Sequence, residues 1–541
     1  MSINVPFQFD LMVFPKMHQN LLNLYSKPPE NKENDSSSSE AQQILHLPTI
    51  NGKYLLFTPF TGPRKRFTAT TPGYYYKCMG DVSLIRRTCE ENGLREHKSE
   101  WRILWGNKNM RSNVYTGLAR WQKINHFPRS FEITKKDCLF KNIAKMQALH
   151  GIDQFGFIPE TYVLPNETYA LEQQMLEDPG VMWIIKPSAK SQGKGIYLTN
   201  KPAELPSGQS YVACRYIDNP LLINELKFDL RIYVAVTSLD PLRIYIYKEG
   251  LVRFATEKYR RGQIDNRFVH LTNYSVNKFS PNFVSVDQDG QGHKWTLTAL
   301  REYFKSHNQD FSLIWSKIKD IVVKTIISNE SKNYASMKMF VPYRQNCFEL
   351  LGFDILIDDS YTPWLLEVNL SPSLNTDSPL DLRIKGKLIA DLFNLVGIPA
   401  KQKNAKKSKP VRKPAWNSST ISANTQFELS QEEIYVLKET NNELQRLGDF
   451  ERIFPSELSF VYMPYFEEER TMNLLVCGEL DKAKRQPTRS AEKAFLGNVY
   501  RQRLKPLTRE RKNKPNSAAY LNQAERYLRQ QVFRPSMLNP I

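Results

Sequence analysis

Short apolar runs, several of them alternating with polar residues, dominate the chain between residues 181 and 370. Runs of this length that are rich in β-branched and aromatic residues are typical of strands. Seven runs fit the pattern: VMWIIKP (181–187), GIYL (195–198), SYVACRYI (210–217), KFDLRIYVAV (227–236), PLRIYIY (241–247), GFDILID (352–358) and PWLLEVN (363–369). The pattern therefore predicts a strand-rich central region.

Apolar residues spaced three or four positions apart predict helices around these strands. The predicted helices lie within residues 137–150, 297–328, 380–397 and 430–448. In the first, Leu149 belongs to the apolar face. Gly397 ends the third, and Ser430 with Glu433 forms a capping box that begins the fourth. Short apolar runs between residues 54 and 128 indicate a small α/β domain.

Changes in composition divide the chain into six segments. Residues 31–43 are polar and of low complexity, which is typical of disorder. Residues 401–413 hold seven Lys or Arg and no acid, as a solvated linker or a nuclear-localisation signal does. We predict a flexible N-terminal segment (1–48), an N-terminal α/β subdomain (49–135), a central subdomain (136–225), a C-terminal subdomain (226–400), a basic linker (401–424) and a basic helical extension (425–541).

The net charge of +19 indicates an acidic partner, which could be nucleic acid, an anionic membrane or an acidic protein surface. Residues 481–541 carry 15 Lys or Arg against 4 Asp or Glu, so much of the excess lies near the C-terminus. No apolar run approaches the ~20 residues that span a bilayer. The six cysteines are scattered without C-x-x-C spacing, which favours reduced thiols in the cytosol.

Two polar residues, Glu367 and Asn369, interrupt the apolar run PWLLEVN. Residues at i and i+2 of a strand share a face. If residues 352–369 form a hairpin centred near 360–361, Asp354 pairs directly with Glu367, and Leu366 and Val368 face the core. Two carboxylates and an amide oxygen on one face suit Mg²⁺. The alternative is a solvated polar surface.

Lys186 ends the predicted strand 181–187, and a glycine-containing loop follows it. A buried lysine without an anionic partner is costly, and a nucleotide phosphate would be such a partner. Gly193 and Gly195 allow backbone amides to approach phosphate oxygens. The alternative is an ordinary surface turn, since the P-loop pattern is absent. Together with the carboxylate hairpin, these features predict an ATP site with a neighbouring hinge strand at residues 212–218.

Several longer motifs resemble the tubulin tyrosine ligase-like family, and within it the polyglutamylases. They are INGKYLLFTPF (50–60), KINHFPRSFEITKKDCLFKNI (123–143), KFDLRIYV (227–234), DPLRIYIYKEGLVRFATEKY (240–259), HLTNYSVNK (270–278) and LLEVNLSPS (365–373). The resemblance covers about residues 50–400. It implies an α/β ATP-grasp fold whose N-terminal, central and C-terminal subdomains precede the basic extension.

The resemblance also implies a reaction and its partners. ATP phosphorylates a glutamate γ-carboxylate in a tubulin C-terminal tail, and the amine of free L-glutamate attacks the acylphosphate. Tubulin and microtubules are the expected partners, and nucleic acid and membranes are not. We expect a monomer with a cytoplasmic, cytoskeletal location, including the centrosome, basal body or cilium, and a microtubule-binding role for residues 425–541.

The resemblance assigns roles to individual residues. ATP contacts fall to Lys186, Gln192, Gly193, Cys214, Arg215, Tyr216, Ile217, Lys227, Asp229, Thr272 and Asn273. Glutamate contacts fall to Gln192, Arg253, Ser275 and Lys385. Mg²⁺ ligands are Asp354, Glu367 and Asn369, and the catalytic set is Lys186, Arg231 and Glu367. Arg253 and Lys385 suit a substrate with two carboxylates, because both are cations.

Two positions depart from the family pattern. Cys214 stands where many relatives have Gln, and Leu370 stands where some have His or Arg. Both lie near the expected position of a growing chain, so they bear on whether a branch is initiated or elongated. We expect initiation. The alternatives are a tubulin glycylase, an ATP-grasp ligase acting on another acid, and a non-catalytic basic protein that binds microtubules or nucleic acid.

Overall fold

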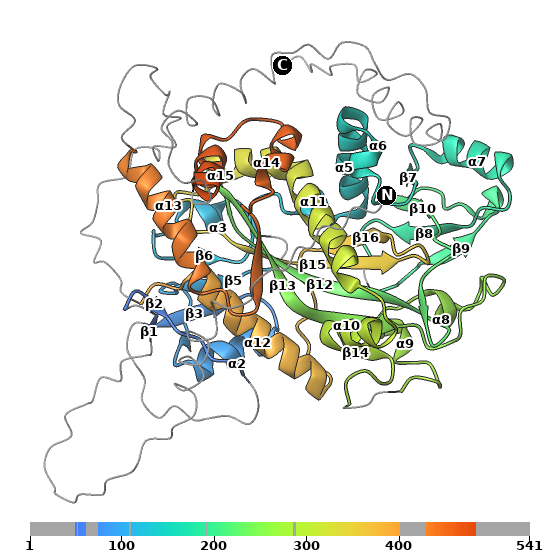
Figure 1. The fold of residues 1–541 in the computed structure, drawn as a ribbon, viewed down its shortest axis with the longest axis horizontal. Coiled ribbons are helices and arrows are strands. Elements are labelled where there is room, and N and C mark those ends of the chain that lie inside the picture. Colours follow the sequence, from blue (N-terminus) through green and yellow to red (C-terminus); the bar gives the residue numbers. More distant parts are fainter. Residues whose placement is uncertain are drawn as a thin grey trace, which may run out of the picture. The chain divides into compact units, whose positions relative to one another are not determined.

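The computed structural model describes residues 49–50, 52–60, 74–107, 110–190, 192–284, 288–400 and 429–482 (Figure 1). Residues 1–48, 401–424 and 483–541 lie outside the described residues. These are the predicted flexible segment, the predicted basic linker and the greater part of the predicted basic extension.

A seven-stranded antiparallel sheet carries the two longest strands, β12 and β13. The strand order is β14-β13-β12-β15-β16, with β11 paired to β12 and β17 paired to β13. The bounds are β11 Leu222–Ile223, β12 Leu226–Leu239, β13 Leu242–Phe254, β14 Lys294–Thr296, β15 Glu349–Ile357, β16 Pro363–Asn369 and β17 Phe450–Phe454. Four of the seven predicted strand runs belong to this sheet.

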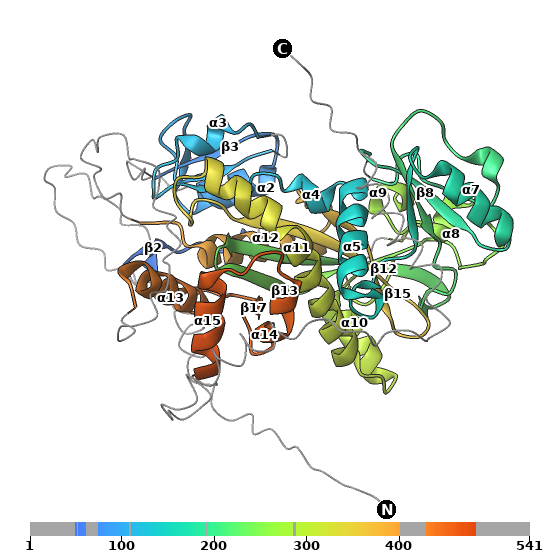
Figure 2. The same ribbon diagram turned by 90° about the horizontal axis from the view of Figure 1, so that it is seen from above.

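Two smaller sheets of four strands lie toward opposite ends of the large one (Figures 1 and 2). The first has the order β7-β10-β8-β9 and contains the other three predicted runs; its bounds are β7 Thr161–Leu164, β8 Trp183–Pro187, β9 Tyr197–Thr199 and β10 Tyr211–Arg215. The second is parallel, with the order β4-β3-β5-β6; its bounds are β3 Tyr75–Cys78, β4 Arg95–Glu96, β5 Ile103–Trp105 and β6 Lys123–Ile124. β1 (Thr49–Ile50) pairs with β2 (Tyr54–Leu55).

The large sheet is buried on both faces. Along β12, Leu230 and Ile232 belong to one apolar core, and Tyr233 and Ala235 belong to another. Side chains of a strand alternate between faces, so two covered faces explain the nearly continuous apolar run. α11 (Phe311–Phe340) and α5 (Lys136–His150) contribute to the first core, and α12 (Pro379–Val396) and α2 (Ser83–Glu91) contribute to the second.

The remaining helices are short or peripheral. They are α3 Asn113–Thr116, α4 Phe131–Thr134, α6 Ile152–Phe155, α7 Thr168–Glu177, α8 Arg267–His270, α9 Tyr274–Asn277, α10 Leu297–Ser306, α13 Gln431–Leu444, α14 Ser459–Tyr462 and α15 Thr471–Lys482, with 3₁₀ turns at Pro202–Glu204 and Met463–Tyr465. No described helix combines the length and apolar character needed to cross a membrane.

The predicted helices are present, and their ends differ in detail. Gly397 ends α12 in the left-handed conformation at φ 68°, and the capping box of Ser430 and Glu433 begins α13. α13 ends at Leu444, ahead of the predicted Gly448. Leu149, which the helical spacing places on the apolar face, is 61% exposed. In the same last turn, His150 instead packs on Phe155 and Tyr465.

Residues 429–482 pack against the large sheet. β17 pairs with β13, and Phe454, which is fully buried, belongs to the core that α11 covers. The Oε2 atom of Glu443 on α13 accepts hydrogen bonds from the hydroxyls of Thr237 and Tyr245. The described part of the chain beyond the basic linker is therefore continuous with the sheet, while the predicted domain boundaries stay predictions.

Candidate active site

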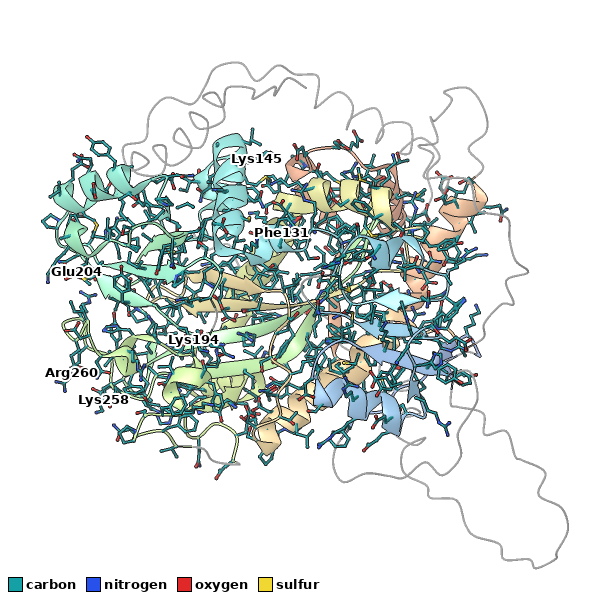
Figure 3. The ribbon with its side chains drawn as sticks, turned by 180° about the vertical axis from the view of Figure 1, so that it is seen from behind. Phe131, Lys145, Lys194, Glu204, Lys258 and Arg260 are labelled. Atoms are coloured by element: carbon teal, nitrogen blue, oxygen red, sulfur yellow. The ribbon has the colours of Figure 1, made fainter. Side chains whose placement is uncertain are left out.

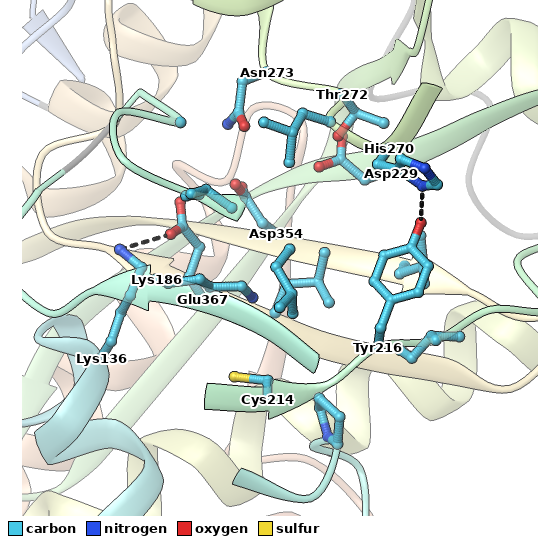
Figure 4. Close-up of a pocket in the computed structure, with 18 of the residues that line it drawn as sticks. Lys136, Lys186, Cys214, Tyr216, Asp229, His270, Thr272, Asn273, Asp354 and Glu367 are labelled. Carbon is cyan, nitrogen blue, oxygen red and sulfur yellow. Dashed lines mark hydrogen bonds and ion pairs between the residues drawn. The ribbon is translucent and has the colours of Figure 1, made fainter. Parts of the chain in front are cut away.

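A pocket lies where β8, β10 and the loop after β8 face β12, β15 and β16 (Figure 4). It holds about 860 Å³ of space, part of which is open to solvent. The predicted site residues that line it are Lys186, Gln192, Gly193, Cys214, Arg215, Tyr216, Ile217, Lys227, Asp229, Thr272, Asn273, Asp354 and Glu367. The structure thus brings the strand lysine, the glycine loop, the hinge and both carboxylates together.

The other predicted site residues lie behind or beside this lining. Arg231 and Arg253 both contact Asp354. The Ser275 hydroxyl donates to the backbone carbonyl of Gln192 at 3.0 Å. Asn369 Nδ2 lies 3.2 Å from Glu367 Oε1.

Lys385 makes its contacts with residues that do not line the pocket. Its ammonium is 2.8 Å from Asp381 and donates to the Asn375 carbonyl at 2.5 Å. Burial lowers the pKa of Lys385, and Asp381 opposes that effect. Lys385 is therefore neutralised by an acid of its own helix, α12.

The carboxylate hairpin forms with the expected pairing of Asp354 and Glu367. Between this pair and the turn, the register shifts by one residue, so that Ile355 pairs with Leu365. Such a shift is a β-bulge, in which one strand holds an extra residue. The prediction that Leu366 faces the core was wrong: Leu365 is fully buried, and Leu366 lines the pocket.

Arginines surround the Asp354 carboxylate. Arg231 Nε lies 2.6 Å from Oδ1, and Arg253 Nη2 lies 2.8 Å from Oδ2. Burial alone would raise the pKa of Asp354, but the two guanidinium groups hold it well below its usual value. Arg253 also donates from Nε to Asp229 Oδ1 at 2.8 Å. Arg253 therefore bridges two buried carboxylates, one from β12 and one from β15.

Lys136 is a site residue that sequence reasoning missed. Its Nζ lies 3.1 Å from Glu367 Oε2 and 3.3 Å from the backbone carbonyl of Lys190 (Figure 4). Lys136 begins α5, so it joins the carboxylate hairpin to the glycine loop. The sequence places it inside a family-like motif, but only the fold shows which acid it meets.

The glycine loop adopts left-handed backbone conformations at Gln192 (φ 65°), Gly193 (φ 74°) and Gly195 (φ 73°). A Cβ atom on Gly193 would meet Val276 Cγ2 at 2.8 Å and Asn273 Oδ1 at 3.2 Å. Glycine is therefore required at position 193 both by the backbone conformation and by the close approach of the segment that follows α8.

Besides Lys136, two buried lysines contribute positive charge to the pocket. Among the described residues, the largely buried side chain of Lys186 has no hydrogen-bond or ion-pair partner. Burial lowers the pKa of Lys227 to about 7, with Lys186 adding to the effect and Asp229 opposing it. An anion in the pocket would relieve both costs.

His270 is the second lining residue that sequence reasoning missed. Its Nδ1 lies 2.8 Å from the hydroxyl of Tyr216 (Figure 4). At the hinge itself, the backbone N–H groups of Arg215 and Tyr216 donate to the carbonyls of Glu160 and Met182. In the described part of the chain, the next N–H, that of Ile217, has no such partner.

Within the described ranges, no group of three or more His, Cys, Asp and Glu side chains is arranged to hold a metal ion. The predicted magnesium ligands are two acids and one amide, all oxygen donors on one face. Glu367 lines the pocket, and Asn369 lies beside it with its Nδ2 on Glu367. The donor chemistry fits Mg²⁺, provided that the cation replaces Lys136 at Glu367.

Comparison with known proteins identifies the family. A family model described as "Tubulin-tyrosine ligase family" matches residues 112–406. Tubulin polyglutamylase TTLL5 of Mus musculus is 40% identical over 452 residues, 76% of this chain and 34% of that protein. Tubulin monoglutamylase TTLL4 of Homo sapiens is 39% identical over 420 residues, 71% of this chain and 35% of that protein.

A third relative, tubulin polyglutamylase ttll-5 of Caenorhabditis elegans, is 35% identical over 494 residues, 80% of this chain and 66% of that protein. The chain spans about a third of the length of the mouse and human relatives. The range matched by the family model exceeds half of the chain and includes every strand that lines the pocket. The chain therefore belongs to the tubulin-tyrosine ligase family.

Proposed function

We propose that the chain is an ATP-dependent ligase that joins glutamate to glutamate side chains in tubulin C-terminal tails. The observation that carries the proposal is the pocket itself, which Lys186, Lys227, the glycine loop and the Asp354–Glu367 pair line together. The choice of substrate rests on the similarity to a tubulin polyglutamylase and a tubulin monoglutamylase.

ATP would lie between the hinge and the carboxylate hairpin. The free N–H of Ile217 is available to the adenine edge, and the phosphates reach Lys186, Lys227 and the amides of the glycine loop. Lys186 would gain the anionic partner that it lacks among the described residues. Gln192 and Gly193, both in left-handed conformations, line the pocket on the side of the glycine loop.

Asp354, Glu367 and Asn369 would hold Mg²⁺, which when bound neutralises negative charge on the phosphates. This chain's own part in that event is to release Lys136 from Glu367. Arg231 and Arg253 keep Asp354 ionised, so this ligand needs no deprotonation before it binds a cation.

The reaction transfers the γ-phosphoryl group of ATP to a tail carboxylate, and ADP leaves. The neutral amine of free glutamate then attacks the acyl carbon, the new amide bond forms, phosphate leaves and the amine loses a proton. Charge stabilisation and positioning contribute most to chemistry of this kind. Lys186 and Arg231 provide the protein's share of that charge. No protein nucleophile is required.

The amino-acid substrate would be held by Arg253, Lys385, Ser275 and Gln192. Arg253 is already shared by Asp229 and Asp354, and Lys385 by Asp381. A glutamate carboxylate would therefore join existing ion pairs, which keeps both cations charged and oriented before the substrate arrives. Two cations favour an acidic amino acid over glycine.

An acidic tail would approach over a cationic surface. Lys194 extends from the glycine loop, and Arg260 and Lys258, the latter paired with Glu225, lie exposed as well (Figure 3). Surface charge of this kind raises the association rate in a salt-dependent way. The basic extension would add to it by binding microtubules, which places the enzyme at the cytoskeleton, including the centrosome, basal body or cilium.

The test is incubation of the chain with ATP, microtubules and labelled glutamate or labelled glycine. We expect label from glutamate in tubulin and none from glycine. Glu367→Gln should abolish incorporation, and Glu457→Gln, on the surface beyond β17, is the matched control that should not. Incorporation of glycine, or of no label, would overturn the proposal.

A second assignment concerns the position of the new bond. The similarity to a relative named monoglutamylase favours initiation of branches on unmodified tails. Mass spectrometry of tails from unmodified microtubules should show single glutamates on tail residues. If only tails that already carry a branch gain mass, the enzyme elongates, and the initiation assignment is wrong.

A further inference from the structure

A line of hydrogen bonds runs from an exposed loop to the floor of the pocket. His270 Nε2 lies 2.8 Å from the backbone carbonyl of Gln263, and His270 Nδ1 lies 2.8 Å from the Tyr216 hydroxyl. Lys227 Nζ donates to the same hydroxyl at 2.9 Å. The line therefore ends on a lysine that lines the pocket.

The direction of every bond in this line is fixed by its first member. A carbonyl can only accept, so the proton of neutral His270 must sit on Nε2. Nδ1 is then an acceptor, and the Tyr216 hydroxyl must donate to it. That donation leaves the lone pairs of the Tyr216 oxygen free to accept from Lys227.

The surroundings favour this arrangement. Burial lowers the pKa of His270, with Gln263 opposing and Lys227 adding to the effect, so the ring is held neutral. All three side chains are at most 9% exposed, so water competes little for their bonds. The Lys227 ammonium also lies 4.3 Å from the centre of the Tyr216 ring, which adds a cation–π contact.

We propose that His270 is a positioning residue for nucleotide binding, which acts through the Tyr216 hydroxyl to aim Lys227 at the phosphates of ATP. The inference rests on the proposed function only in naming ATP as the ligand of the pocket. His270 touches neither the phosphates nor the reacting atoms. Its effect is to fix the Tyr216 hydroxyl proton toward Nδ1, so that the lone pairs of the oxygen point at Lys227.

The chemistry of the line predicts a specific kinetic pattern. Tyr216→Phe keeps the ring and its cation–π contact but removes the shared hydroxyl. His270→Ala removes the group that orients it. The first variant loses the hydrogen bond to Lys227, and the second loses the bond that orients the shared hydroxyl, so we expect KM for ATP to rise about tenfold in each. Because kcat and KM for glutamate depend on other residues, both should stay within about twofold of their original values.

The decisive measurement is a double-mutant cycle on ATP affinity, read by calorimetric titration of the full chain with ATP. If His270 acts through Tyr216, the double variant binds ATP no more weakly than either single variant. Independent contributions would instead multiply to about a hundredfold loss. Additive losses, or single variants that bind ATP like the original chain, would overturn the proposal.

Folding and function are separated by two controls. Thermal unfolding of each variant shows whether the chain is intact, and Tyr216→Phe tests the proposal if His270→Ala does not fold. His307→Ala, an exposed histidine at the end of α10, should leave ATP affinity unchanged. A chain that binds ATP but ligates no glutamate contradicts the proposed function while the cycle still decides the role of His270. A chain that does not bind ATP overturns both.

Discussion

Removal of residues 401–541 should unfold the enzyme, whereas removal of residues 483–541 should not. Besides Cys477, the segment 429–482 contributes eight buried apolar side chains: Val436, Phe450, Ile453, Phe454, Tyr462, Phe466, Met472 and Val476. They pack in the same two cores as the large sheet. Their loss would expose the partner side chains of β13 and α11 as well.

The magnitude follows from the burial. A fully buried apolar side chain contributes ~1.5–3 kcal/mol, so eight contribute roughly 12–24 kcal/mol, an upper estimate. Two buried ion pairs would also lose a partner: Arg243 with Glu443 (3.4 Å) and Glu330 with Arg470 (3.2 Å). An orphaned buried charge costs ~3–5 kcal/mol. A typical domain is stable by only about 5–15 kcal/mol, so the shorter chain should not fold.

Circular dichroism, thermal unfolding and ATP titration of chains ending at residues 400 and 482 provide the assay. We expect a cooperative transition and unchanged ATP affinity for the longer chain, and neither for the shorter. Phe454→Ala tests the same contacts singly and should cost about 3–5 kcal/mol, against less than ~0.5 kcal/mol for Val461→Ala, which is 61% exposed. Cooperative unfolding and full ATP affinity of the chain ending at residue 400 would refute the reasoning.

Three further predictions concern the pocket. Gly193→Ala should weaken ATP binding about tenfold, because Ala is strained at φ 74° and its Cβ meets Val276. The control is Gly208→Ala, at φ 77° with open space around its Cβ. Equal losses of ATP affinity in the two variants would contradict the steric argument. Lys136→Met should lower the Mg²⁺ concentration for half-maximal ligation, since it frees Glu367; a higher requirement would show that Lys136 assists the metal. Binding of ATP at pH 8 should take up about 0.9 proton, because Lys227 with a pKa of about 7 is mostly neutral there and a phosphate restores its charge. Below about pH 6 Lys227 is already charged, so the uptake should vanish. Calorimetry in buffers of different ionisation enthalpy measures the proton uptake.

The strands and the pairing of the carboxylates could be predicted from the sequence because both follow from local rules. Alternation with period two identifies β12 and the hairpin, and a turn near residue 360 sets Asp354 opposite Glu367. The same alternation places Lys227, Asp229 and Arg231 on one face of β12. Lys227 and Asp229 line the pocket, and Arg231 contacts Asp354.

The parts that escaped prediction depend on contacts between distant segments. Lys136 meets Glu367 only because α5 packs beside β16, and His270 meets Tyr216 only because the loop after β13 folds back on the hinge. Neither residue stands out by spacing or composition. The exposure of Leu149 was missed for a related reason: helical periodicity identifies a face but not where the neighbouring elements end.

The bulge at Leu366 lies between the carboxylate pair and the turn. The predicted side of Leu366 was therefore wrong, while the predicted pairing of Asp354 with Glu367 was correct. Without the extra residue, strict alternation back from Val368, which is buried, would send Leu366 into the core and Leu365 into the pocket. The observed shift sends Leu365 into the core and leaves Leu366 beside Glu367 in the pocket wall. An apolar side chain next to a carboxylate limits access of water and strengthens its interaction with any cation. The irregularity therefore affects both ends of the hairpin, because it keeps the turn end packed while two adjacent residues of β16 line the pocket.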